Sequence, residues 1–195
     1  LTIEASKASG VVEGETLTLT GATITGKDVA EYTTVADYTW SVKKGDNSDS
    51  TDNYTIDVTG TLTITAKKTG LTVSGETKEQ VYNGEALEGS GSGTADDDSD
   101  VTIKYAVKSG EGEEATWSEW STTVPSITDK GTVTYKVQAS NANYETVESG
   151  EYTLTVTAKT ITVNDTATLE YNGANQTLTI EASKASGVVE GETLT

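Results

Sequence analysis

Three aspartates in the middle of the sequence have a spacing that suits a bound cation. Asp96, Asp98 and Asp100 alternate within the stretch ADDDSD, and calcium loops use alternating acidic oxygens to surround the ion. The glycine and the distant glutamate that complete an EF-hand loop are missing here. A weak calcium site is therefore a hypothesis, set against the simpler interpretation of a solvated acidic loop. No other cofactor is expected.

Two tryptophans are the candidates for an aromatic contact with a ligand. Trp117 and Trp120 lie in the stretch ATWSEWSTT, and indole rings can stack on sugar rings. A spacing of three residues places two side chains on opposite faces of a regular strand. We therefore predict that at least one ring packs in the core or at a bulge, and keep a carbohydrate platform as the alternative.

The triplet Tyr-Asn-Gly occurs twice, and both occurrences are interpreted as structural turns. They consist of Tyr82, Asn83 and Gly84, and of Tyr171, Asn172 and Gly173. Asn-Gly favours positive φ and a tight turn. An adjacent tyrosine can pin such a turn to the surface of a sheet. Ligand contacts at the triplets are the less favoured interpretation.

Catalytic chemistry has little support in the residue types. The chain has no His and no Cys, which excludes Ser-His-Asp triads, thiol nucleophiles and most metal centres. Two of the 31 acidic residues could in principle cleave a glycoside as a pair, but nothing singles out such a pair. We expect no enzymatic activity and no catalytic residues.

The charge of the chain limits its partners. The 31 acidic residues outnumber 13 Lys and Arg, for a net charge of −18. Such a surface repels the phosphates of nucleic acids and of anionic lipids. No apolar run approaches the roughly 18 residues that a membrane helix needs. The sequence therefore predicts no nucleic-acid partner and no membrane insertion.

The composition and the local patterns favour an all-β fold. Thr, Val and Tyr suit extended strands, and 19 Gly supply turns together with Asn, Asp and Ser. No window carries a helical apolar stripe. Alternation in VTIKYAV and TVTYKVQ places Tyr105 and Tyr135 on inward faces, and Ala106 and Lys136 on outward faces. The sequence predicts β-sandwiches.

An exact repeat is the most informative feature of the chain. Residues 1–18 read LTIEASKASGVVEGETLT, and residues 178–195 repeat them without a change. Chance does not produce such an identity, so the sequence repeats with a period of 177 residues, the distance from Leu1 to Leu178. A fixed period of this kind indicates an array of repeated modules.

A fainter similarity divides one period into two related modules. DNYTIDVTGTLTITAKK at 52–68 is similar to ANYETVESGEYTLTVTAKT at 142–160. We expect residues 1–67 to be the C-terminal part of one module, 68–158 a complete module, and 159–195 the N-terminal part of the next. No linker separates them, and short junctions restrict bending. An elongated, stiff array is therefore expected.

The chain resembles the MBG-type and related bacterial Ig-like repeats of giant cell-surface proteins. The similarity lies in TITVNDTATLEYNG, GETLTLTGATITGKDVAEYT and NYTIDVTGTLTITAK, and the module at 68–158 resembles a sister type. Ala30 departs from the glycine that many relatives have after Asp-Val. The resemblance implies tandem Ig-like sandwiches, with smaller β-grasp-like modules as the alternative. It also implies an extracellular location at a bacterial cell surface, with cell-wall anchoring elsewhere in the parent chain.

The expected function is that of a non-catalytic stalk or spacer in an adhesin-like surface protein or extracellular fibre. Its partners would be neighbouring repeats of the same protein. One alternative is an adhesion module that binds a glycan or a protein. Another is a subunit that completes its neighbour head to tail in a filament, because the module at 1–67 would lack opening strands that residues 159–195 offer.

Overall fold

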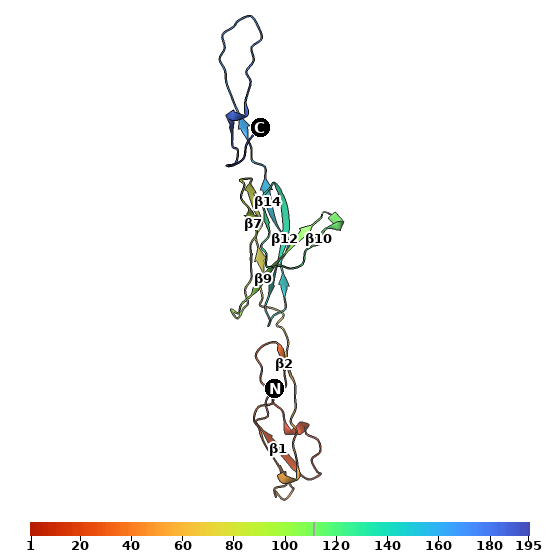
Figure 1. Cartoon of the computed structure of the whole chain (residues 1–195). Coiled ribbons are helices and arrows are strands. Elements are labelled where there is room, and N and C mark those ends of the chain that lie inside the picture. Colours follow the sequence, from red (N-terminus) through yellow and green to blue (C-terminus); the bar gives the residue numbers. More distant parts are fainter. Residues whose placement is uncertain (111) are drawn as a thin grey trace. The chain divides into compact units, whose positions relative to one another are not determined.

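The protein is all-β, as the composition predicts. The computed structural model describes residues 1–110 and 112–195, and for Glu113 only the backbone. These residues form sixteen strands and four 3-10 turns (Figure 1). Within the same residues, no helix is long and apolar enough to span a membrane.

The chain divides into two compact units. Residues 1–69 and 142–145 form unit 1, and residues 70–141 and 146–195 form unit 2. Residues 159–195, which the repeat predicts to begin a further module, belong to unit 2.

One mixed sheet is the framework of unit 2. Its strands follow the order β10-β9-β12-β14-β6, with β13 added beside β12. Their bounds are Lys78–Val81 (β6), Thr102–Ser109 (β9), Thr116–Trp117 (β10), Gly131–Ser140 (β12), Val147–Glu148 (β13) and Tyr152–Thr157 (β14). β12 pairs antiparallel with β9 and β14, and β14 pairs parallel with β6. In Figure 1 the long strand β12 lies in the middle of this sheet.

The core of unit 2 consists of the side chains that the alternation places inward. Tyr105, Tyr135, Val137 and Leu154 form one buried cluster, and Tyr135 is completely buried. The Tyr135 ring centroid lies 6.2 Å from that of Tyr105 and 5.7 Å from that of Tyr152. Tilted rings at such distances add to the stabilisation that burial provides.

A second layer of two short ribbons, one of them containing glycines, covers this core. β5 (Ser74–Gly75) pairs with β8 (Gly91–Ser92), and β7 (Leu87–Glu88) pairs with β11 (Ser126–Ile127). A Cβ on Gly91 would lie 2.7 Å from Cγ1 of Val137 and 2.9 Å from Cε1 of Tyr105, so only glycine lets this backbone approach the core. The two layers make the unit sandwich-like.

The Tyr135 hydroxyl joins the segments of this second layer. It donates to the carbonyl oxygen of Glu76 at 2.7 Å and accepts from the backbone nitrogen of Ser90 at 3.2 Å. A buried hydroxyl without partners would destabilise the fold. These bonds let a polar group sit at the centre of the core.

The outer face of the sheet departs from one expectation. Ala106 is predicted to face outward, yet it is only 2% exposed. Its partner across the ladder is Lys136, whose ammonium lies over the ring of Trp117. Ala106 therefore lies beside Lys136 in the sheet, and its small side chain is buried there.

Unit 1 contains two antiparallel ladders. β1 (Thr16–Thr20) pairs with β3 (Thr39–Lys43), and β2 (Ala30–Tyr32) pairs with β4 (Leu62–Ile64). The 3-10 turns of this unit are η1 (Ala5–Lys7) and η2 (Thr51–Asn53). Its buried hydrophobic side chains include Ala22, Ile24 and Val42 in residues 1–69, and Tyr144 in the segment 142–145.

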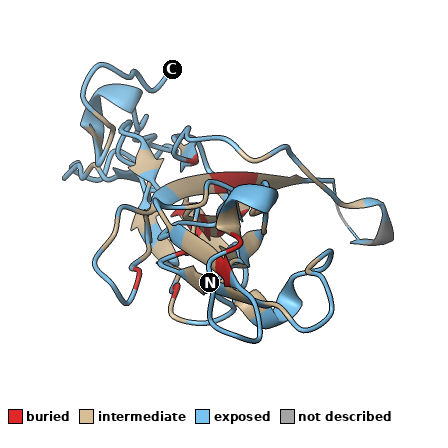
Figure 2. Ribbon diagram, turned by 90° about the horizontal axis from the view of Figure 1, so that it is seen from below, coloured by how far each residue is buried: buried red, intermediate tan, exposed pale blue. Residues whose placement is uncertain are grey.

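The C-terminal part of unit 2 holds one short ladder and a long exposed excursion. β15 (Thr162–Val163) pairs with β16 (Ala185–Ser186), which follows the 3-10 turn η4 (Ala182–Lys184). Residues 166–184 between the two strands are exposed and belong to no strand. Figure 2 shows buried residues both on strands and on connecting segments, whereas the ribbon near the C-terminus is exposed.

Candidate functional site

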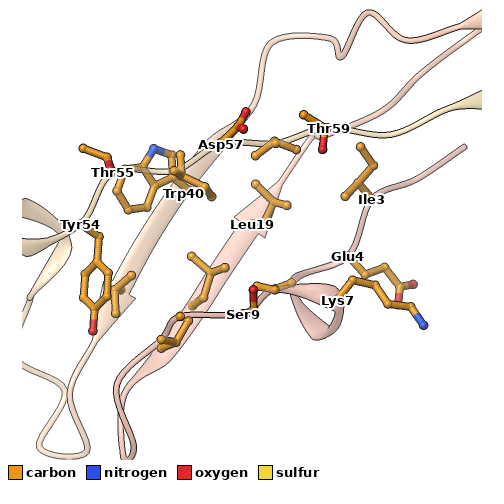
Figure 3. A pocket seen from close by; sticks show the side chains of 18 residues that line it. Ile3, Glu4, Lys7, Ser9, Leu19, Trp40, Tyr54, Thr55, Asp57 and Thr59 are labelled. Carbon is orange, nitrogen blue, oxygen red and sulfur yellow. The ribbon is translucent and has the colours of Figure 1, made fainter.

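Unit 1 contains a groove of about 380 Å³ (Figure 3). Its floor consists of apolar side chains that alternate along the paired strands β1 and β3. These side chains are Leu17, Leu19, Trp40 and Val42. Leu17 lies opposite Val42, and Leu19 opposite Trp40. Cross-strand pairs share a face of the sheet, so the ladder directs all four into the groove.

One wall of the groove is the extended segment at 54–60. Along residues 54–60, half-buried and exposed positions alternate in the manner of a strand. Tyr54, Ile56 and Val58 are the half-buried side chains that line the groove. Nevertheless residues 54–60 belong to no ladder in the part of the chain that the structure describes. This wall has the form of a strand but lacks the pairing.

The opposite wall comes from the first copy of the exact repeat. After η1, the chain continues through Ala8 and Ser9 along the groove, with Ala8 in extended backbone conformation (φ −72°, ψ 150°). The described residues provide no strand partner for this stretch either. An apolar floor between two unpaired extended walls suits an extended peptide better than a compact small molecule.

A tyrosine–glutamate pair lies at one end of this groove. The Tyr54 hydroxyl donates a short hydrogen bond to Oε2 of Glu15 and accepts one from the backbone nitrogen of Val12 at 3.2 Å. The bond to the Glu15 carboxylate raises the pKa of Tyr54 above its ordinary value of 10.0. The Tyr54 phenol therefore stays protonated at neutral pH and cannot act as a base or a nucleophile. Its hydrogen bond joins the wall at 54–60 to Glu15.

The second copy of the repeat makes the same kind of pair with a different tyrosine. Glu192 is the sequence equivalent of Glu15, and its Oε1 accepts a short hydrogen bond from the Tyr82 hydroxyl. That bond raises the pKa of Tyr82. Tyr82 thereby contacts a glutamate of unit 2 through its hydroxyl group.

The two Tyr-Asn-Gly triplets have the same backbone arrangement. Gly84 and Gly173 have φ of 84° and 78°. Oδ1 of Asn83 accepts from the nitrogen of Glu85 at 2.9 Å, and Oδ1 of Asn172 accepts from that of Ala174 at 3.0 Å. The tyrosines differ, however: Tyr82 is half-buried, whereas Tyr171 is 93% exposed. The expectation that Tyr171 pins its turn to a sheet is wrong, because a ring so exposed covers no sheet surface.

Hydrogen bonds to Gly70 and Asn141 hold the acidic loop at 96–100 in place. The nitrogen of Asp96 donates to the carbonyl of Gly70 at 2.8 Å, and Asp98 has a positive φ of 57°. The Asn141 amide donates to the carbonyl oxygen of Asp100 at 2.8 Å. In the described residues no three His, Cys, Asp or Glu side chains are grouped to hold a metal ion. Calcium binding at Asp96, Asp98 and Asp100 stays a hypothesis.

A second oxygen-rich loop, at 45–53, is organised in a similar way. Oδ1 of Asp46 accepts from the Ser48 hydroxyl at 2.6 Å and from the Ser48 nitrogen at 3.0 Å. Asp49 accepts from the nitrogen of Thr51 at 2.8 Å. These hydrogen bonds, led by those from the Ser48 and Thr51 side chains, lower the pKa of both carboxyls. The carboxylates act as turn-forming acceptors.

Trp117 lies on the outer face of the main sheet of unit 2. It pairs with Lys108 across the ladder, and the ammonium groups of Lys136 and Lys108 lie 4.6 and 5.7 Å from its ring centroid. Lys108 also forms an ion pair of 3.3 Å with Glu151. Trp120 is half-buried further along the same segment. The Trp117 ring therefore already takes part in cation–π contacts within the protein.

Comparison with protein-family models, with curated proteins and with solved structures found no match.

Sequence reasoning missed the groove in unit 1 and the glycine layer in unit 2. A signal for the second existed, because GSGSG at 89–93 places a glycine at every second position, the spacing of one strand face. A signal for the groove also existed, since YTIDVTG at 54–60 alternates like a strand. Neither stretch revealed whether a partner covers it.

Proposed function

We propose that the chain is a non-catalytic spacer repeat of an extracellular, cell-surface fibre or adhesin-like protein of a bacterium, built from tandem Ig-like modules. In this role the module between residues 70 and 158 transmits tension between its neighbours. The observation that carries the proposal is the pairing of β6 with β14. These strands lie near the two ends of that module, and they pair in parallel, with Leu154 opposite Lys78 and Thr157 opposite Val81.

Parallel terminal strands resist tension by shear. Tension on the chain pulls β6 towards its N-terminal end and β14 towards its C-terminal end. Because the strands are parallel, those directions are opposite along one ladder, and all of its hydrogen bonds are loaded together. An antiparallel pair at the ends would instead open one bond at a time. The geometry thus suits a module that must stay folded under load.

The core behind this ladder supports the same interpretation. Leu154 and Val156 of β14 are buried, at 0% and 1% exposure. Leu154 packs in the cluster around Tyr135. Sliding β14 along β6 would therefore expose apolar surface as well as break hydrogen bonds, at about 25 cal/mol for each Å² exposed.

Single-molecule pulling on a tandem of the 70–158 module tests the proposal. The nitrogen of Tyr82 donates to Thr157 across this ladder. The alternation of a parallel ladder then directs the Gln80 N–H to β14 and the Glu79 N–H away from it. Gln80→Pro should lower the unfolding force, with a loss of about 1 kcal/mol from the missing bond. Glu79→Pro is the matched control and should change the force much less.

If the unsubstituted module and Gln80→Pro unfolded at equally low forces, the proposed mechanical role would be contradicted. Adhesion to a glycan or a protein is the competing function, and its best surface is the outer face around Trp117. The two lysines that already contact this ring favour a packing role for it, so the spacer remains the better-supported function.

A further inference from the structure

The chain segment that carries Trp117 and Trp120 holds one extra residue beside β9. Trp117 lies opposite Lys108. Ser121 lies opposite Tyr105, with backbone hydrogen bonds of 2.7 and 2.9 Å between them. Two residues of β9 separate these partners, whereas three residues separate Trp117 from Ser121. A mismatch of one residue between paired strands is a β-bulge, and this bulge decides which face each tryptophan occupies.

Both tryptophans lie on the outer face of the main sheet of unit 2. Trp117 shares that face with Lys108. Tyr105 belongs to the buried core, so its partner Ser121 is on the inner face and the preceding Trp120 is on the outer face. A regular strand would direct two residues with a spacing of three to opposite faces. The bulge therefore brings two half-buried indole rings to one surface.

Three lysines gather on the same surface. Lys104 and Lys108 flank Ala106 along β9, and Lys136 lies opposite Ala106 in β12. Like charges on neighbouring positions of one sheet face repel each other. Glu151 pairs with Lys108 at 3.3 Å, whereas the described residues give Lys104 and Lys136 no ion pair. In a chain with a net charge of −18, this surface carries uncompensated positive charge.

Trp117 holds two of these ammonium groups in place. The ammonium groups of Lys136 and Lys108 lie 4.6 and 5.7 Å from its ring centroid, where the indole ring attracts a cation. Side chains that are already ordered lose less conformational freedom when they bind a ligand. Trp117 therefore keeps its packing role and prepares the two lysines for an anion, while Trp120 is left to contact the ligand.

We propose that this surface binds an acidic polysaccharide, a sugar chain that carries carboxylate groups. The ammonium groups of Lys104, Lys108 and Lys136 pair with the carboxylates. The exposed part of the Trp120 ring packs on the apolar face of a sugar ring. These side chains come from β9, β12 and the bulged segment beside β9, so the sheet fixes their spacing. The proposal goes beyond the spacer role, because it gives the module a ligand.

The composition of the chain favours a sugar chain over a nucleic acid. The chain contains no arginine, the side chain whose planar fork binds phosphate with two hydrogen bonds. A net charge of −18 repels a polyphosphate, whereas an acidic polysaccharide can carry its charges further apart. With the module recurring at a period of 177 residues, a long polymer contacts several weak sites at once and gains by avidity.

Isothermal titration calorimetry on the full chain with a galacturonic acid oligosaccharide tests the proposal. Binding should weaken as the salt concentration is raised from about 0.02 M to about 0.15 M, where charges are screened beyond about 8 Å. The methyl ester of the same oligosaccharide carries no charge and should not bind. Lys136→Gln should weaken binding about fivefold, because one surface ion pair is lost. Lys130→Gln removes the same charge from the exposed segment before β12, and should change the affinity less than about twofold.

NMR of the indole N–H groups of the three tryptophans locates the contact. The signals of Trp117 and Trp120 should shift during the titration with the oligosaccharide. Trp40 belongs to unit 1 and is the internal control, whose signal should stay unchanged. Lys136→Arg keeps the positive charge and should therefore restore most of the affinity that Lys136→Gln loses.

Three results would overturn this proposal: no binding of the acidic oligosaccharide, equal binding of its methyl ester, or equal losses with Lys136→Gln and Lys130→Gln. Tighter binding of an oligothymidylate would also contradict it, and would assign the surface to single-stranded nucleic acid. The pulling experiment contains no ligand. A failure here therefore leaves the mechanical proposal standing, and a failure there leaves the binding of an acidic polysaccharide standing.

Discussion

Residues 1–18 and 178–195 have the same sequence but different surroundings. In the first copy, Glu15 binds the hydroxyl of Tyr54, and the strand that begins at Thr16 pairs along its whole length with β3. In the second copy, Glu192 binds the hydroxyl of Tyr82, and Ala185 and Ser186 pair with β15. Each copy uses an edge that the other leaves unpaired.

This difference separates local from tertiary causes of structure. The 3-10 turn and the positive φ of its glycines recur in both copies, so the sequence alone is sufficient for them. The strands and the tyrosine partners do not recur, because a strand exists only where another segment supplies donors and acceptors.

The largest expected effect comes from removing the central core side chain of unit 2, the unit that contains the second copy of the repeat. Tyr135→Ala deletes a fully buried ring and its bonds to Glu76 and Ser90. Such a change should lower the free energy of unfolding of unit 2 by about 3–5 kcal/mol. Chemical denaturation followed by tryptophan fluorescence measures the loss.

The same variant tests whether the copies are independent. Hydrogen exchange should accelerate at β12 and β14 and at residues 185–186, while the amides of β1 keep their protection. Equal acceleration in β1 would show that both copies depend on one cooperative core.

A smaller effect should distinguish two glycines at equivalent positions. Gly10 and Gly187 share a positive φ, but a Cβ on Gly187 would lie 2.7 Å from the carbonyl oxygen of Thr160, whereas nothing lies within 4 Å of one on Gly10. Gly10→Ala should cost about 1 kcal/mol of backbone strain. Gly187→Ala adds the clash and should open the β15–β16 ladder, which hydrogen exchange at Val163 and Ala185 detects.

Gly14 and Gly191 provide the control for this pair. Both have positive φ, and a Cβ added to either glycine would meet no atom within 4 Å. Alanine at either site should therefore have the same effect. Unequal effects at Gly14 and Gly191, or equal effects at Gly10 and Gly187, would contradict the account.

The smallest effect concerns the two tyrosine–glutamate pairs. Hydrogen bonds to Glu15 and Glu192 raise the pKa of Tyr54 and Tyr82, so the folded protein holds these protons more tightly than the unfolded chain does. Their contribution to stability is complete below the ordinary pKa of about 10. It is lost as the pH rises through the higher folded values.

Titration of the tyrosine ring carbons by NMR measures the two pairs separately. Glu15→Gln should lower the pKa of Tyr54 towards its ordinary value and leave that of Tyr82 unchanged, and Glu192→Gln should do the reverse. A change at both tyrosines in either variant would mean that the copies do not hold separate partners.

The all-β class and the core positions could be predicted because they depend on spacing within one segment. Tyr105 and Tyr135 are buried where alternation places them. The burial of Ala106 could not be predicted, since it depends on neighbours from other strands, such as Lys136 opposite it in β12. GSGSG could equally form a flexible linker; only the close approach of Tyr105 and Val137 to Gly91 turns it into a close-packed layer.

The sequence by itself determined the period, the turns and the alternation of apolar residues, because each depends on neighbours along the chain. Only the tertiary structure decided which extended segments are paired. It gave the 162–163 segment to the second copy of the repeat and left the groove beside Ala8 and Ser9 open. The physical reason is that a ladder needs two strands, and which segments meet depends on the fold of the whole unit.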